Sequence, residues 1–321
     1  MKIELLLGAM KNIETAKNGS PYEVIENIHR AKDKGIDVLI GPEWSLTCPP
    51  GVYTKTLIKK NKAKDAIDIL FNAPDYVEYA PRDAKKILEA QIEDGLEIFD
   101  EVPRIPYSKR EYQKLLNGLK MASRGSDMII FPGTAMFYDE NKVLYNVMPV
   151  VRDGELVKEI YKFRDGLGSN FNLNDELILY PTEVYSKSIY NPSKNKLKFT
   201  NDEKYQRFEN IIYTGCTNAE PISKLSYGGN PIIHFNGLLT SAEICADAGL
   251  LSEMNVNNLD LQILSSCGNS STESVINNSG YIAVVDGFKD VEIRVSGKHT
   301  PKLRPVEKSD KMYSFNLEFY L

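Results

Sequence analysis

The sequence predicts an α/β fold in which helices cover largely buried strands. In the N-terminal half, short apolar runs of strand length alternate with patterns of helical period. Further short apolar runs follow toward the C-terminus and predict more strands. Of the 321 residues, 42% are hydrophobic and 26% are charged, which are ordinary proportions for a globular protein. The length alone is compatible with one domain or two.

The first three expected elements lead to an acidic side chain. Residues 2–8 form a short apolar run typical of a strand. A helix is expected from Pro21, a residue type favoured at the first helical position, to Gly35, where it ends. The apolar residues 37–41 predict a second strand, and the proline after it places Glu43 at that strand's carboxyl end. Because open α/β sheets bind ligands at such ends, Glu43 is a candidate site residue.

An insertion and a well-marked helix are expected next. Residues 48–107 carry polar and helical material, which we interpret as an insertion within the domain. Ser108 and Glu111 then form a capping box that marks the start of a helix. A strand is expected at 127–133. The buried face of the helix is predicted to consist of Tyr112, Leu115, Leu116, Leu119 and Ala122.

A hairpin is predicted to place a lysine at another strand end. Its strands are expected at 143–151 and 156–162, joined by Asp153-Gly154, a dipeptide typical of tight hairpin turns. Lys162 therefore stands at the end of the second strand.

The rest of the chain contains a second insertion and the remaining strands. Residues 177–225 are expected to form this insertion, because much of the segment is polar and has no clear period. Order resumes with the run LLTSAEICAD, in which Cys245 follows an apolar strand. Later strands are expected in LDLQILSS, YIAVVDG and MYSFNLEFYL.

Composition and charge exclude several classes of function. A net charge of −5 and a pI near 5.5 do not favour nucleic acid or an anionic membrane surface as partners. No run approaches the roughly 20 apolar residues that span a bilayer, and no signal-peptide pattern is present, so a cytoplasmic protein is expected. The cysteines are too few and scattered for a disulfide scaffold, and none forms a zinc pair: Cys48, Cys216, Cys245 and Cys267.

Three apolar strands thus end with reactive side chains, in the order Glu43, Lys162 and Cys245. The segments around them read G-P-E-W-S-L-T, Y-N-V through D-G-E-L to Y-K, and I-C-A-D. With these motifs in this order, the chain resembles the nitrilase superfamily of carbon–nitrogen hydrolases, nearest to its amidase-like members. The resemblance implies a four-layer α-β-β-α sandwich, a single domain over residues 1–321, and assembly into a homodimer or larger homo-oligomer.

The resemblance also implies catalytic roles, which the chemistry of these residue types supports. Cys245 is expected to be the nucleophile, but a thiol with an ordinary pKa of about 8.5 needs a nearby base or positive charge. Glu43 is expected to be the general base and Lys162 to stabilise the oxyanion. The expected substrate is a small amide or nitrile, which forms an acyl-enzyme that water releases. No cofactor and no metal are expected, because the three histidines lack metal-ligand spacing: His29, His234 and His299.

Further positions near the triad concern substrate binding. In members of the superfamily an acidic residue follows the lysine, and Glu176 fits this substrate-binding or supporting place. Asp247 matches the C-x-D pattern and is expected to shape the turn after the nucleophile. The family usually has an arginine shortly after this aspartate, whereas Ala248, Gly249 and Leu250 follow here. The roles carried by that arginine, in binding a substrate carboxylate or in anchoring a loop, are therefore in doubt for this chain.

Other functions remain compatible with the sequence. An acyltransferase would use the same cysteine acyl-enzyme, with an amine in place of water. A catalytically silent binding or scaffold protein would retain the fold, and the missing arginine and enlarged loops favour this alternative. A papain-like pair would require His234 to lie beside Cys245.

Overall fold

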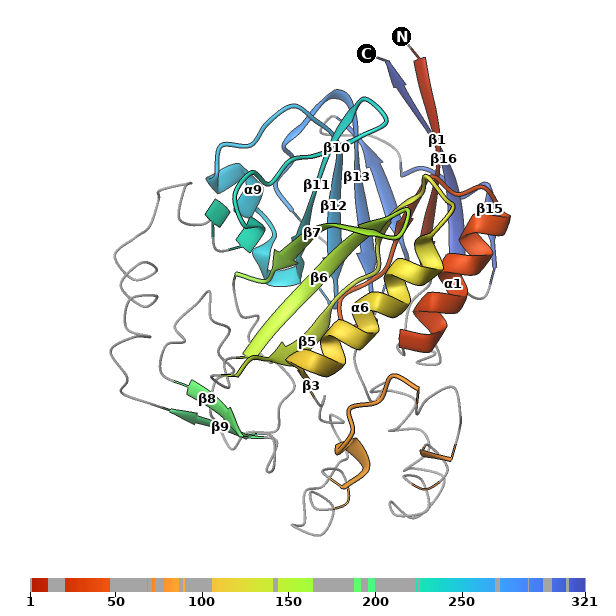
Figure 1. The fold of residues 1–321 in the computed structure, drawn as a ribbon. Helices are drawn as coiled ribbons and strands as arrows, with labels where there is room; N and C mark the ends of the chain where they lie inside the picture. The colour runs from red at the N-terminus through yellow and green to blue at the C-terminus, as the bar shows by residue number, and fades with distance from the viewer. Residues whose placement is uncertain are drawn as a thin grey trace.

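A computed structural model shows two β-sheets with helices outside them (Figure 1). The described residues are 2–10, 21–46, 68, 71–72, 78–86, 89, 106–140, 144–163, 188–191, 196–199, 223–224, 226–268, 272–287, 289–296, 302–309 and 312–320. Much of both expected insertions, together with Glu176, lies outside these residues.

The first sheet is mixed and has nine strands within the described residues. Its order is β15-β16-β1-β2-β4-β6-β5-β3, with β7 beside β6. β1 pairs antiparallel with β16 along its whole length and parallel with β2 on its other side. The strands are β1 (Lys2–Met10), β2 (Val38–Ile40), β3 (Tyr107–Ser108), β4 (Ile129–Phe131), β5 (Ala135–Tyr138), β6 (Leu144–Arg152), β7 (Glu155–Tyr161), β15 (Glu307–Lys308) and β16 (Met312–Tyr320).

In the second sheet, five strands are described, in the order β10-β11-β12-β13-β14. Its three central strands are parallel, so their carboxyl ends meet at one edge of the sheet. The strands are β10 (Ile233–Phe235), β11 (Leu238–Ile244), β12 (Leu259–Ser266), β13 (Ile276–Asp286) and β14 (Glu292–Val295). A separate two-stranded sheet is formed by β8 (Ser188–Asn191) and β9 (Lys196–Phe199).

Two helices cover the outer face of the first sheet (Figure 1). Helix α1 spans Pro21–Asp33, and helix α6 spans Lys109–Ser123. The predicted capping box of α6 is present: Ser108 accepts from the backbone N–H of Glu111, whose carboxylate accepts from the N–H of Ser108. The apolar faces of both helices pack on side chains such as Leu39 and Ile130, which lie in the helix-covered core. All five residues predicted for the buried face of α6 are buried.

The main core lies between the two sheets. Alternate residues of the first sheet, such as Ile40 and Met148, share one apolar cluster with Ala242, Ile263 and Val285 of the second sheet. The turn η3 (Cys245–Asp247) and the short helix α9 (Leu250–Glu253) follow β11, and the leucines of α9 belong to the same apolar cluster. Glu243 of β11 accepts from backbone N–H groups around the start of α9. The predicted four-layer α-β-β-α arrangement is confirmed.

Several elements differ from the sequence-based expectation in their limits. The strand expected at 37–41 is shorter, because regular pairing stops at Ile40. The strand ending at Asp286 is longer than the apolar run YIAVVDG, since it begins at Ile276. Within the expected insertion at 177–225, the pairing of β8 with β9 was not predicted.

Candidate active site

Glu43 lies where the first sheet meets the second. It follows β2, and its side chain is only 1% exposed. Its backbone N–H donates to the carbonyl of Ser266 at the end of β12 (3.3 Å), and the hydroxyl of Ser265 donates to the carbonyl of Gly41 (2.9 Å). These two hydrogen bonds join the first sheet to the second next to Glu43 and fix the position of the Glu43 backbone.

A close approach of two backbone segments shapes the turn that carries Glu43. Trp44 has a positive φ of 67°, and its N–H donates to the hydroxyl of Thr134 (3.0 Å). Gly133 has a φ of 85°, and a Cβ atom there would stand 2.0 Å from both the carbonyl oxygen of Pro42 and the hydroxyl of Ser45. Only glycine fits this position without displacing the turn.

We expect Gly133→Ala to lower the free energy of unfolding by about 3 kcal/mol, because backbone strain and overpacking act together. Urea denaturation measures this loss. Gly35→Ala is the matched control: Gly35 also has a positive φ, 66°, but a Cβ atom added there would meet nothing within 4 Å. Its expected cost is about 1 kcal/mol. Equal losses in the two variants would contradict the role given to the contact with Pro42.

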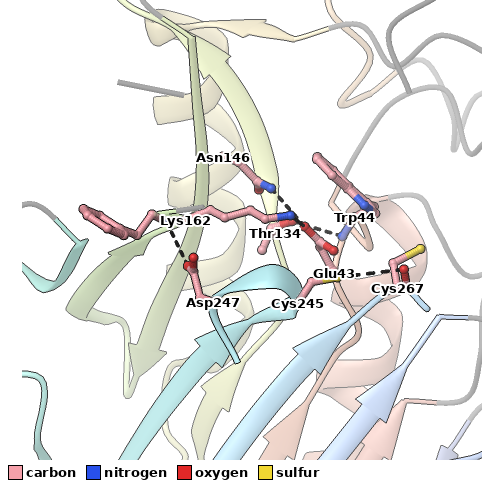
Figure 2. A network of polar contacts seen from close by, with 9 residues as sticks. Glu43, Trp44, Thr134, Asn146, Lys162, Cys245, Asp247 and Cys267 are labelled. Atoms are coloured by element: carbon pink, nitrogen blue, oxygen red, sulfur yellow. Dashed lines mark hydrogen bonds and ion pairs between the residues drawn. The ribbon is translucent and has the colours of Figure 1, made fainter. Parts of the chain in front are cut away.

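Lys162 follows β7 and points into the space between the sheets. Its ammonium Nζ lies 2.7 Å from Oε1 of Glu43, and both side chains are almost fully buried. Nζ also lies 5.5 Å from the ring centroid of Trp44, within range of a cation–π interaction. Asn146 donates through Nδ2 to the same oxygen of Glu43 (3.1 Å). Figure 2 shows these side chains around the carboxylate. Removing one partner from a buried ion pair lowers the free energy of unfolding by about 3 to 5 kcal/mol, because the other charge is left buried without compensation. Each of the two side chains therefore depends on the other.

Cys245 reaches the same place from the second sheet. It is the first residue after β11 and has a positive φ of 46°, a strained conformation for a non-glycine residue. Its Sγ lies 3.9 Å from the carbonyl oxygen of Cys267. Burial and the negative charge of Glu43 raise the pKa of the Cys245 thiol to about 11, against the opposing effect of Lys162. At neutral pH the resting thiol is therefore protonated and needs a base.

Asp247 connects the nucleophile turn to the strand end that carries Lys162. Its carboxylate is buried and accepts from the backbone N–H of Phe163, the residue after Lys162 (2.8 Å; Figure 2). The sequence predicted a turn-shaping role for Asp247, and the structure adds this bond between the two sheets. The bond links the residue after Lys162 to the turn that follows β11.

The structure thus brings together the three residues predicted for catalysis. Glu176 is outside the described residues, as are Cys48 and Cys216. Asn146 was not predicted as a site residue, although it is the asparagine of the Y-N-V motif. His234 is exposed and pairs with Leu239, toward the start of β11, so the structure does not place it beside Cys245. Neither of the described cysteines, Cys245 and Cys267, forms a disulfide bond.

Neither a metal cluster nor a membrane-spanning helix is found in the described part of the chain. No group of three or more His, Cys, Asp or Glu side chains there could hold a metal ion. None of the described helices is long and apolar enough to cross a membrane.

Comparisons with known proteins find similar folds only. No protein-family model matches the chain, and no curated protein matches it. Among solved structures, the glutamine-dependent NAD+ synthetase from Acinetobacter baumannii is 12% identical, with a TM-score of 0.43. The match covers 99% of this chain and 46% of the synthetase, so the chain spans about half of that protein's length.

Amidase structures are also similar. An amidase from Nesterenkonia sp. is 10% identical, with a TM-score of 0.44, and the match covers 98% of this chain and 90% of the amidase. A mutant of the amidase from Nesterenkonia sp. AN1 shows Michael addition of acrylamide at its active-site cysteine. It is 9% identical, with a TM-score of 0.44, and 99% of this chain and 93% of that chain are covered. At such low identity the likeness concerns the fold alone and does not extend to the activity.

Proposed function

We propose that this protein hydrolyses non-peptide carbon–nitrogen bonds, as an amidase that acts through a Cys245 acyl-enzyme. The observation that carries the proposal is the buried ion pair between Glu43 and Lys162 beside the Cys245 thiol. A carboxylate, an ammonium group and a thiol gathered at one place supply a base, an oxyanion partner and a nucleophile. The three side chains come from two different sheets, and each stands at a strand end.

In the first half of the proposed reaction, the thiol proton passes to Glu43 and Sγ attacks the carbonyl carbon of the amide. Both described donors to Glu43 use Oε1, so we assign Oε2 as the oxygen that accepts the proton. The carbonyl π electrons move to oxygen, and Lys162 stabilises the resulting oxyanion. An ammonium group has three N–H donors, so Lys162 can serve Glu43 and the oxyanion together. The intermediate then collapses, the carbon–nitrogen bond breaks, and Glu43 returns its proton to the leaving ammonia.

The second half releases the acyl group to water. Glu43 accepts a proton from water as its oxygen attacks the thioester carbonyl. The new tetrahedral intermediate expels Cys245 as the leaving group, and the proton on Glu43 returns to sulfur. The net reaction converts an amide and water into a carboxylic acid and ammonia. A thiol with a raised pKa is a poor leaving group. In this scheme Lys162 and Glu43 therefore have to assist its departure, and we assign all three residues to one catalytic unit.

The test is ammonia release by the wild-type protein from a panel of small amides and nitriles, combined with intact-protein mass spectrometry. We expect ammonia from at least one amide, together with an acyl adduct on the peptide that contains Cys245 after rapid acid quenching. Ammonia release with an adduct on a different residue would refute the assignment of Cys245. No release and no adduct across the panel would favour a silent binding protein.

The same acyl-enzyme distinguishes hydrolysis from acyl transfer. Product masses in the presence of added amines would show the acid for a hydrolase and the new amide for an acyltransferase. Glu176 as a supporting residue, the single domain over 1–321, the cytoplasmic location and the homo-oligomer stay predictions from the sequence.

A further inference from the structure

Asn146 faces the site because of its place in the hairpin that carries Lys162. The last residue pair of the β6–β7 ladder is Val147 opposite Tyr161, and the backbone N–H of Lys162 donates to the carbonyl of Asn146 (2.9 Å). Side chains alternate along a strand, so Asn146 shares the inner face with Met148, which lies in the core between the sheets. Asn146 and Lys162 are therefore neighbours that point the same way.

The two neighbours bind the same carboxylate oxygen but differ in chemistry. Nδ2 of Asn146 and Nζ of Lys162 lie 3.1 Å and 2.7 Å from Oε1 of Glu43. Lys162 brings a charge, which an oxyanion would share during the reaction. The amide of Asn146 is neutral and has no titratable proton, so its bond to Glu43 persists while charges around it change. Two donors on Oε1 also fix the rotation of the carboxyl group and thereby the direction of Oε2.

The other end of the same amide is buried without a hydrogen-bond partner among the described residues. Oδ1 of Asn146 is completely covered, and Asn146 as a whole is 1% exposed. A buried acceptor without a partner loses its hydration and gains nothing in return. A side chain that only filled this space would be more stable without that oxygen. The amide group contributes through its other end, where Nδ2 donates a hydrogen bond to Glu43.

We propose that Asn146 is a positioning residue that fixes the rotation of the Glu43 carboxylate and directs its Oε2 toward the Cys245 thiol. This inference rests on the proposed function, in which Glu43 is the general base. Loss of the Nδ2 donor would leave the rotation of the carboxylate to Lys162 alone. The side chain needs no contact with substrate for this role.

The test uses the rate at which iodoacetamide alkylates Cys245 as a function of pH, which requires no knowledge of the substrate. The negative charge of Glu43 raises the pKa of the thiol, so the midpoint of the profile depends on how the carboxylate is placed. Glu43→Gln gives the midpoint in the absence of that charge. In Asn146→Leu we expect the midpoint to move by about one unit toward that of Glu43→Gln, because a carboxylate that is no longer held toward the thiol acts on it less. Turnover of the best amide should fall about 10- to 100-fold in kcat with KM unchanged.

A matched control and a second variant keep the test decisive. Asn27 on α1 is also a buried asparagine with one unpartnered atom among the described residues, and Asn27→Leu should keep the wild-type midpoint. Asn146→Asp preserves the shape of the side chain. If the leucine variant does not fold, Asn146→Asp should move the midpoint to higher pH, because its added negative charge raises the pKa of the thiol. A wild-type midpoint in a folded Asn146 variant overturns the proposal. If the midpoint moves but the wild-type protein hydrolyses no amide, the positioning role stands and the proposed function fails.

Discussion

Replacing Cys245 with alanine is expected to reduce amide hydrolysis by about 10⁶-fold, to the background rate. The reason is that the proposed acyl-enzyme requires a sulfur atom at the end of β11, and alanine has none. The pair of Glu43 and Lys162 would remain, but a base and an ammonium group alone give only weak assistance to water. Ammonia release at saturating amide, measured over hours, sets the limit on residual activity.

Cys267→Ala is the matched control for this loss. Cys267 is the other described cysteine, and its backbone carbonyl oxygen lies 3.9 Å from Sγ of Cys245. The alanine variant keeps that carbonyl and should retain most of the activity. If both variants hydrolysed amides at the wild-type rate, the chemistry would have to use another nucleophile.

Glu43→Gln should lower turnover by about 10²- to 10⁴-fold, the usual contribution of a general base, while Cys245 stays reactive toward iodoacetamide. The negative charge of Glu43 is one cause of the raised thiol pKa, and burial is the larger one. Removing this charge favours the thiolate, so the thiol pKa falls from about 11. The alkylation profile should therefore move to lower pH as turnover falls.

Continued alkylation of Cys245 together with a loss of turnover distinguishes a general base from a residue that only supports the structure. A damaged site would lose alkylation and turnover together, and thermal unfolding of the variant would show it. Glutamine keeps the shape of the side chain and can still accept from Lys162, which limits such damage. A profile that moves to higher pH, or turnover at the wild-type level, would contradict the role assigned to Glu43.

The sequence predicted the elements of the site better than the contacts between them. Strand ends at Glu43, Lys162 and Cys245 follow from local signals, namely a proline, a hairpin dipeptide and an apolar run. The capping box of α6 is local too, and it was found correctly. Local patterns carry this information because the interacting residues lie within a few positions of one another.

Contacts between distant segments could not be predicted in this way. The bond from Asn146 to Glu43 spans 103 positions, and the one from Phe163 to Asp247 spans 84. Which segments meet depends on how the two sheets pack, and one sequence does not state that. The restriction to glycine at Gly133 likewise arises from the backbone near Pro42, on a different segment. The hairpin of β8 and β9 was missed because its four-residue strands are too short for a clear period.

The division of the site between the two sheets has a consequence for folding. Glu43 and Lys162 follow strands of the first sheet and Cys245 follows a strand of the second, so this base and this thiol meet only when the two sheets pack together. A partly folded chain would carry Cys245 as an ordinary cysteine, with the pKa of a solvated thiol. The reactivity of this one sulfur therefore reports whether the sheets have docked. During refolding, its characteristic pH profile should emerge only with the final, global step, which makes the nucleophile an intrinsic probe of tertiary assembly.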